Sequence, residues 1–192
     1  MTDLLERPKQ PSRHRLDVDA YYKMVEAGIL PRDQRVELID GEIIDVNAMG
    51  SRHAAIKNDL AQLFIRSLSN DVARVICQSP LRLDSYNEPE PDVAILRPRA
   101  DRYRSSHPGG ADVLLLIEVS DAALAYDRSA KLSLYAKFGV PEVWIVDIAG
   151  AAIEVYREPK GEDYSAREHR SDGWLSPSLV SGLTVDVAAL FR

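Results

Sequence analysis

The stretch VLLLIEVSD, residues 113–121, decides the fold of this chain. Its continuous apolar run is typical of a β-strand covered on both faces, since half-exposed strands alternate apolar and polar side chains. Glu118 interrupts the run, and an unpaired carboxylate inside a buried strand is costly in free energy. The stretch therefore predicts a central strand whose end carries a charge that needs a partner.

The segment after this strand predicts a βαβ unit. We expect Asp127 to cap a helix over RSAKLSLYAKF, which Gly139 ends and Pro141 follows. EVWIVDI, residues 142–148, predicts a second buried strand, and the crossover between the two strands should be right-handed. Beyond it we expect a peripheral hairpin from IEVYRE and YSAREH and a short helix in DVAALFR.

Three shorter β-like runs precede the central strand. They are VARVICQ, LRLDS and PDVAIL, residues 72–78, 81–85 and 91–96. An arginine-rich loop, RPRADRYRSSHPGG, joins the last of them to the central strand. The single cysteine of the chain, Cys77, lies in the first run, so we expect a buried and inert thiol.

The N-terminal part predicts an arm and then a helix. Residues 1–15 are polar, and we expect a flexible arm before one domain over residues 16–192. Asp17 or Asp19 can cap a first helix, and Gly28 can end it.

A hairpin and a longer helix follow. In RVELIDGEIIDV, residues 35–46, the pair Asp40-Gly41 predicts a tight hairpin because both turn residues need positive φ. A helix from Ser51 to about Ser69 should bury the stripe Ile56, Leu60, Leu63, Phe64 and Leu68. Together these elements predict an α/β fold: a mixed central sheet flanked by helices, with an N-terminal β-hairpin.

Composition limits the function. A chain of 192 residues with 45% hydrophobic and 28% charged residues is ordinary for one globular domain. Nothing approaches the roughly 18 apolar residues of a membrane span, and the N-terminus lacks a secretory signal, so we expect a cytoplasmic protein. The net charge of −6 opposes tight coating of nucleic acid. The motifs of phosphate loops, dinucleotide folds and zinc proteases are absent from the sequence.

Two carboxylates form the candidate site. Asp92 opens the strand before the central one, and Glu118 lies near the end of the central strand. If these strands are antiparallel neighbours in a matching register, both carboxylates project from one face of one sheet edge. Two close carboxylates repel unless a cation lies between them, and Mg²⁺ suits such oxygen ligands. The alternative is that Glu118 pairs with an arginine and Asp92 caps a turn after Pro91.

Lys131 lies 13 residues after Glu118, in the first turns of the predicted crossover helix. From there its ammonium could position an attacking water or stabilise charge on a phosphate. Tyr135, four residues later, shares its helical face and could contact substrate or belong to the core. The alternative is a surface ion pair between Asp127 and Lys131, worth only ~0.3–0.5 kcal/mol.

The sequence resembles the Uma-two family of restriction-endonuclease-like proteins in the PD-(D/E)XK nuclease superfamily. The resemblance runs from about Asp17 to Asp147. It rests on VELIDGEI, His53 near the start of a helix, EPEPDVAIL, LLIEVSD, Asp127, Lys131, Tyr135 and GVPEVWIVD, in that order. It implies a restriction-endonuclease-like fold in which Pro91-Asp92 is the PD element, Glu118 the second acidic residue and the Val119 carbonyl an additional metal ligand.

Ser120 departs from the superfamily pattern, because it stands where the motif lysine is normally found. The resemblance implies that Lys131 replaces that lysine. It also singles out Glu37, beside the first hairpin, as an outer carboxylate of the metal cluster.

The basic candidates are less specific. His53 could contact a phosphate or transfer a proton, or it could simply be partly exposed. Arg97 and Arg99, with Arg102 and Arg104, follow from the strand of Asp92 and could grip DNA beside the metal, or they could belong to a solvated loop.

We therefore expect Mg²⁺-dependent hydrolysis of DNA phosphodiester bonds, with Mn²⁺ as a substitute ion. The expected catalytic set is Asp92, Glu118, Lys131 and Glu37. A homodimer is expected, because cutting both strands needs two sites. One rival is a nuclease fold that serves binding or assembly without catalysis, which Ser120 and the acidic charge favour. Another is a metal hydrolase of non-nucleic phosphate esters, which predicts a closed pocket.

Overall fold

A six-stranded mixed sheet forms the centre of the protein, whose computed structural model describes residues 13–31 and 33–192. The strand order is β3-β4-β5-β6-β7-β8, and only β5 and β6 run parallel. The expected α/β class and mixed sheet are confirmed. The strands are β3 Arg74–Cys77, β4 Val93–Leu96, β5 Val113–Ser120, β6 Glu142–Asp147, β7 Ala152–Lys160 and β8 Asp163–Arg170.

A helical crossover joins the parallel strands, as the βαβ pattern predicts. It runs through α3 Leu124–Tyr126, the π-helical turn η2 Asp127–Lys131 and α4 Leu132–Lys137. Gly139 follows with a φ of 71°. The predicted helix cap at Asp127 is wrong. The helix begins before Asp127, and this side chain turns inward to accept a hydrogen bond from Ser120.

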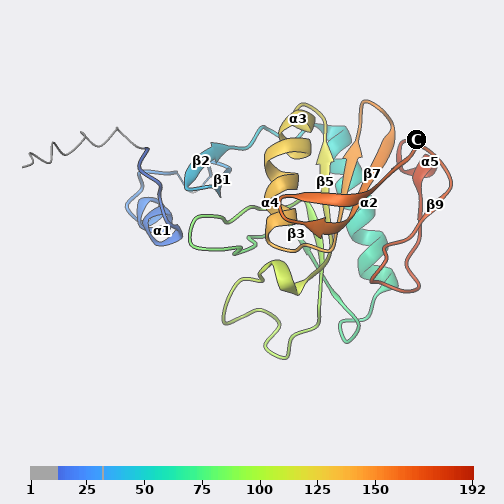
Figure 1. The fold of residues 1–192 in the computed structure, drawn as a ribbon, viewed down its shortest axis with the longest axis horizontal. Coiled ribbons are helices and arrows are strands. Elements are labelled where there is room, and N and C mark those ends of the chain that lie inside the picture. The colour runs from blue at the N-terminus through green and yellow to red at the C-terminus, as the bar shows by residue number, and fades with distance from the viewer. Residues whose placement is uncertain (1–12, 32) are drawn as a thin grey trace, which may run out of the picture.

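Helices cover both faces of the sheet, with α2 Ser51–Ser67 on one side and α4 on the other (Figure 1). Alternation along each strand supplies both cores. Trp144 of β6 belongs to the cluster that contains Phe64 of α2, and Ile145 belongs to the one that contains Tyr135 of α4. Leu63, predicted in the buried stripe of α2, is 37% exposed, so the stripe is narrower than expected.

The C-terminal hairpin is not peripheral, contrary to expectation. β7 pairs with the whole of β6, and β8 then forms the sheet edge. β7 pairs with β6 because the free edge of β6 would otherwise leave buried backbone N–H and C=O groups without hydrogen-bond partners. The remaining C-terminal elements are β9 Trp174–Leu175, β10 Val185–Asp186 and the predicted short helix, α5 Val187–Leu190.

Two other expectations around β3 are wrong. LRLDS forms no strand, because Leu81 and Leu83 bond back to Pro89 and Asn87 within one loop. Cys77 is partly exposed instead of buried, since β3 lies at the sheet edge. The arginine-rich segment is a loop, as predicted, and ends in the short 3₁₀ turn η1 Gly110–Asp112.

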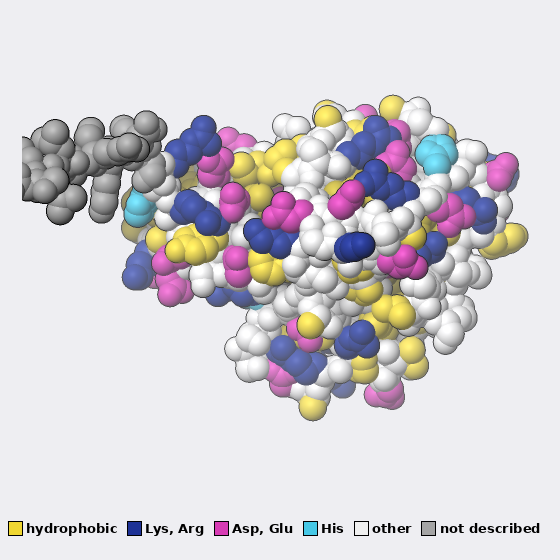
Figure 2. Space-filling model, viewed as in Figure 1, with side chains coloured by type: hydrophobic (Ala, Val, Ile, Leu, Met, Phe, Trp, Pro, Cys, Tyr) yellow, Lys and Arg dark blue, Asp and Glu magenta, His cyan; other side chains and the backbone are white. Residues whose placement is uncertain are grey.

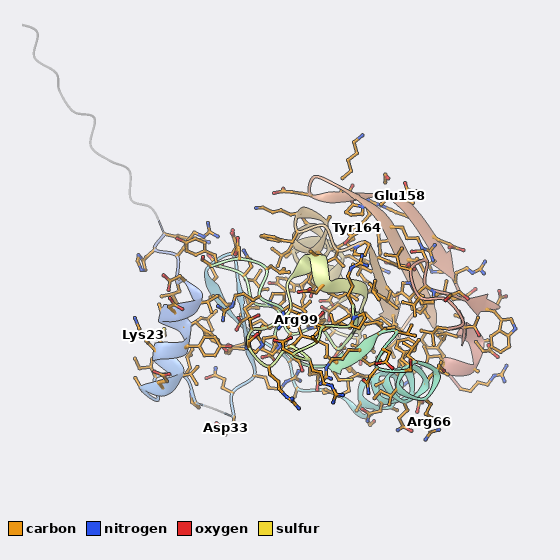
Figure 3. All side chains as sticks on the ribbon, turned by 90° about the horizontal axis from the view of Figure 1, so that it is seen from below. Lys23, Asp33, Arg66, Arg99, Glu158 and Tyr164 are labelled. Carbon is orange, nitrogen blue, oxygen red and sulfur yellow. The ribbon has the colours of Figure 1, made fainter. Side chains whose placement is uncertain are left out.

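The N-terminal part contains α1 Val18–Glu26 and the hairpin of β1 Val36–Ile39 with β2 Glu42–Asp45. Asp17 caps α1, and the turn residues Asp40 and Gly41 have φ of 53° and 76°, which confirms both predictions. Figure 3 shows α1, labelled at Lys23, at one end of the molecule and the end of α2, labelled at Arg66, at the other.

Loop contacts fasten the hairpin to the sheet. Leu38 of β1 bridges to Glu88, whose N–H donates to the Leu38 carbonyl at 2.8 Å. The first part of the predicted arm, residues 1–12, lies outside the described residues, whereas Arg13 and Arg15 pair with Glu42 and Asp40. No described helix is long and apolar enough to cross a membrane.

Candidate active site

Strand register brings Asp92 and Glu118 to the same place. β4 and β5 are antiparallel neighbours with Val93 opposite Ile117, so the next residues outward along the two strands are Asp92 and Glu118. Both are buried. The expected meeting of one strand start with the other strand end is present in the fold.

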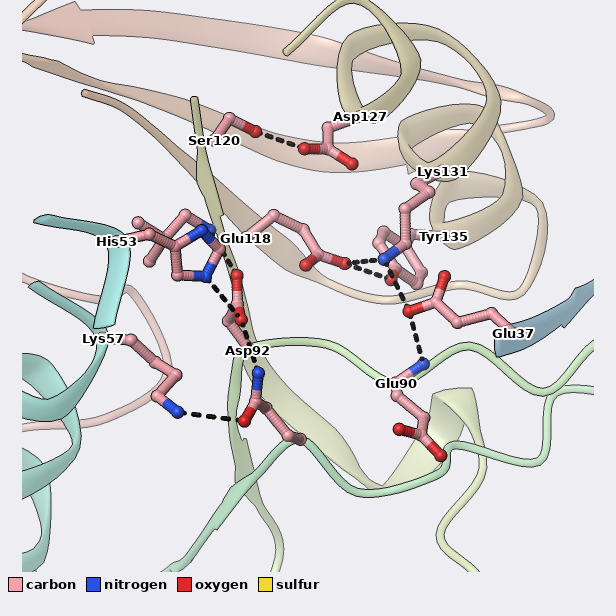
Figure 4. A network of polar contacts seen from close by, with 12 residues as sticks. Glu37, His53, Lys57, Glu90, Asp92, Glu118, Ser120, Asp127, Lys131 and Tyr135 are labelled. Carbon is pink, nitrogen blue, oxygen red and sulfur yellow. Dashed lines mark hydrogen bonds and ion pairs between the residues drawn. The ribbon is translucent and has the colours of Figure 1, made fainter. Parts of the chain in front are cut away.

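Glu118 faces the crossover helices. Its Oε1 lies 2.8 Å from Lys131 Nζ and accepts a hydrogen bond of 2.5 Å from the Tyr135 hydroxyl (Figure 4). Burial raises the pKa of Glu118 to about 8; the Lys131 ammonium opposes this rise, and Asp127 adds to it. The partner of Glu118 is thus a lysine and not an arginine, which was the alternative considered from the sequence. Tyr135 packs in the hydrophobic core and also donates a hydrogen bond to this site.

Lys131 is enclosed by two carboxylates. Its Nζ also lies 3.1 Å from Glu37 Oε1, and its side chain is only 7% exposed. Burial lowers the pKa of Lys131, but Glu118 and Glu37 together with Asp127 raise it more strongly, so the ammonium stays charged. The alternative surface pair of Asp127 with Lys131 is not formed, because Asp127 turns to Ser120.

Asp92 faces the other side, toward α2, so the prediction that both carboxylates project from one face is wrong. Asp92 precedes β4, and the alternation of that strand therefore does not determine the direction of its side chain. Its Oδ1 lies 2.9 Å from His53 Nε2 and 3.4 Å from Gln78 Nε2, and its Oδ2 accepts from the Val119 N–H at 2.9 Å. Gln78 Oε1 in turn accepts from Lys57 Nζ at 3.0 Å. Figure 4 shows this second row of contacts entering from the left, opposite Lys131.

Glu37 reaches the site from β1. It is 5% exposed, and its Oε1 accepts from the Glu90 N–H at 3.1 Å as well as from Lys131. The Glu90 N–H, in the loop before Asp92, thus holds the Glu37 carboxylate beside Lys131, although the two residues are far apart in the sequence.

These side chains surround one pocket of about 130 Å³. The expected residues in its wall are Glu37, His53, Asp92, Glu118, Val119 and Lys131. Sequence reasoning did not place four further charged residues of the wall in the site: Arg35, Glu90, Asp121 and Asp127. Of these, Asp127 was named in the family resemblance but was expected only to cap a helix. Their nearness to the motif residues along the chain was a usable signal, because each lies within nine residues of one of them.

Arg97 and Arg99 are not brought to this pocket. Asp92 precedes β4 and the arginines follow it, so they lie at opposite ends of one strand. Arg99 pairs with Asp101 at 2.6 Å and stacks on Tyr103, while Arg97 Nε donates to the Ala111 carbonyl. Figure 3 labels Arg99.

The donor set suits a hard divalent cation. In the described residues no three His, Cys, Asp or Glu side chains already form a metal-binding group. Mg²⁺, however, needs only one or two carboxylates together with waters. Glu118 Oε2 takes no hydrogen bond from the described part of the chain, and the Val119 carbonyl shares the strand edge of its N–H, which points at Asp92. These oxygens fit the ion.

The sheet, its flanking helices and the acidic pocket define a mixed α/β protein with one candidate metal site. A crystal structure from Anabaena variabilis, described as a "putative nuclease belonging to DUF820", matches with a TM-score of 0.70 at 19% identity, over 92% of this chain and 97% of that one. The family "Uma2: Putative restriction endonuclease" matches residues 18–188. The chain therefore belongs to the Uma2 family, which confirms the resemblance. No curated protein matches it.

Proposed function

We propose that this protein is a metal-dependent endonuclease that hydrolyses phosphodiester bonds in DNA. The observation that carries the proposal is the convergence of Asp92, Glu118, Lys131 and Glu37 on one pocket from separate elements. Membership of the family described as "Putative restriction endonuclease" supports it.

In this proposal Asp92, Glu118 and the Val119 carbonyl hold Mg²⁺ or Mn²⁺. The bound ion supplies charge stabilisation at phosphorus and a water of lowered pKa. The chain's own residues orient the ligands: Tyr135 and Lys131 hold one oxygen of Glu118, and His53 with the Val119 N–H holds Asp92.

Lys131 orients the attacking water. Two of the three ammonium donors are directed to Glu118 and Glu37, which leaves one for a ligand in the pocket. Glu37 acts on the reaction through Lys131. We further propose a homodimer, since one site cuts one strand and two-fold symmetry would present a site to each strand.

One observation favours the rival, a nuclease fold that binds without cutting. The ammonium of Lys131 is already neutralised by two carboxylates, as in a purely structural ion-pair network. Such a network would stabilise the fold even in a protein that has no catalytic activity.

Plasmid cleavage separates the two. We expect nicking that requires Mg²⁺ or Mn²⁺ and is lost in Asp92→Asn and Lys131→Gln, but not in Asp71→Asn, an exposed residue outside the pocket. Metal-dependent DNA binding without cleavage of supercoiled, linear or single-stranded DNA would support the rival. Mn²⁺ binding that persists undiminished in Asp92→Ala would overturn the site assignment.

A further inference from the structure

The positive charge that faces the pocket is scarce. Lys131 is held by Glu118 and Glu37. Two other cations lie close by: Arg35 lines the pocket, and Lys57, just outside its wall, bonds to Gln78, which contacts Asp92. Neither makes an ion pair with any residue in the described ranges 13–31 and 33–192. They are therefore the charges that remain available to an anionic ligand.

Lys57 lies one turn after His53 on the same face of α2, and its side chain is half-buried. Its Nζ has one partner, the Gln78 side-chain oxygen at 3.0 Å, although an ammonium has three donors. The Gln78 amide nitrogen points the other way, to Asp92 at 3.4 Å. The neutral amide thus keeps Lys57 near Asp92 without neutralising either charge.

The position of Gln78 is determined by the backbone. Its φ is 45°, a conformation that non-glycine residues seldom adopt and that is concentrated at functional sites. Its N–H donates to the carbonyls of Pro91 and Asp92 at 3.0 and 3.2 Å. A side chain anchored in this way is a fixed spacer between the lysine and the carboxylate.

Arg35 lies on the opposite side. It directly precedes β1, is exposed and lines the pocket beside Glu37. Figure 4 shows Glu37 and Lys57 approaching the carboxylates from opposite directions, one from the hairpin and the other from α2. The two unpaired cations therefore lie on either side of Asp92 and Glu118.

We propose that Arg35 and Lys57 are the phosphate contacts of the site, and that they hold one DNA strand across Asp92 and Glu118. The inference rests on the proposed nuclease function and names how its substrate is bound. Lysine and arginine bind the phosphate backbone by releasing its counterions. The net charge is −6, and Figure 2 shows Lys and Arg interleaved with Asp and Glu over the face that it draws, so no broad basic surface for DNA is seen there. Lys131 is already paired with Glu118 and Glu37, and the proposed function assigns its remaining donor to the attacking water, not to a phosphate.

The salt dependence of DNA binding tests this directly. Fluorescence anisotropy would follow binding of a fluorescein-labelled oligonucleotide, single-stranded and duplex, to the full chain carrying Asp92→Asn, so that no turnover interferes. Each of Arg35→Gln and Lys57→Gln should make the negative slope of log K against log salt shallower by about 0.7–0.9. Arg74→Gln is the matched control, since Arg74 opens β3 at the end away from Asp92 and also makes no ion pair within the described residues.

The outcomes are distinct from those of the cleavage assay. Lys57→Arg keeps the charge and should restore the slope, which separates a phosphate contact from a loss of folding. Unchanged slopes in both glutamine variants would overturn the inference even if the wild type cuts DNA. A shallower slope in Lys131→Gln would overturn the assignment of phosphate contact to the other two. Shallower slopes in both glutamine variants, together with a wild-type protein that never cuts DNA, would support the phosphate contacts while refuting the nuclease function.

Discussion

The ammonium of Lys131 lies 2.8 Å from Glu118 Oε1, and both side chains are almost completely buried. Lys131→Met would leave Glu118 and Glu37 buried without their cation. Removing one partner of a buried pair costs about 3–5 kcal/mol, so we expect a loss of this size in the free energy of unfolding, measured in urea. Lys137→Met, whose ammonium is 3.6 Å from Glu162 at the surface, should lose less than about 1 kcal/mol.

The double variant Glu118→Gln with Lys131→Met should recover part of this loss, because both members of the pair are then neutral. If Lys131→Met alone were as stable as the wild type, the ion pair would not contribute as described. These measurements also matter for the cleavage assay, since an inactive Lys131 variant is informative only when it is folded.

Metal binding should stabilise the folded protein. An ion that binds only the native chain adds about 2.7 kcal/mol at a concentration of 100 times its Kd. We expect Mn²⁺ to raise the unfolding temperature of the wild type, followed by calorimetry, and to have no effect on Asp92→Asn. Asp71→Asn should respond as the wild type does. An equal rise in Asp92→Asn would place the ion elsewhere.

Gln78→Leu should weaken Mn²⁺ binding although Gln78 is not itself a proposed ligand. Without the amide spacer, Lys57 can turn toward Asp92 and compete with the metal for its carboxylate. Residues that orient metal ligands typically contribute 10–100-fold in affinity, and we expect a loss in this range by titration calorimetry. Adding Lys57→Met should restore much of the affinity. Failure of the second change to do so would exclude competition by the lysine.

Gly41→Ala should loosen the hairpin that carries Glu37. Gly41 has a φ of 76°, and a Cβ there would lie 2.7 Å from the Cβ of Arg15. Gly28→Ala is a matched control, because its φ of 71° gives similar strain while nothing lies within 4 Å of the new Cβ. Both should be destabilised by about 1–3 kcal/mol from backbone strain. Urea unfolding should show the larger loss of unfolding free energy for Gly41→Ala. Equal losses in the two variants would mean that Arg15 moves away from the new Cβ without a cost in free energy.

Local patterns predicted much of the fold. Asp40-Gly41 specified its turn, because few residues other than glycine, asparagine and aspartate tolerate two successive positive φ angles. The apolar runs of β5 and β6 predicted buried strands, and the helix between them required that they run parallel. The meeting of Asp92 with Glu118 needed one further assumption, that β4 and β5 are antiparallel neighbours, and the register agrees with it.

The failures have physical reasons. LRLDS alternates like a strand, but its backbone groups bond within a loop that depends on the distant hairpin. Aspartate is a residue type that often caps helices, yet the carboxylate of Asp127 accepts a hydrogen bond from the buried Ser120 hydroxyl instead. The arginines after β4 could have been placed at the far end from strand direction alone. The link from Lys57 through Gln78 to Asp92 could not, because it depends on one unusual φ at the end of β3.

The bond between Glu37 and Lys131 joins residues 94 positions apart. During synthesis, the ribosome must therefore release the whole crossover helix before the hairpin finds its buried partner. A fragment that ends before Lys131 contains Asp92 and Glu118 but not the cation that balances them. The timing of translation thus delays the completed site until Lys131 has been made, with 61 of the 192 residues still to follow, so that a product truncated before Lys131 would lack the arrangement that we propose cuts DNA.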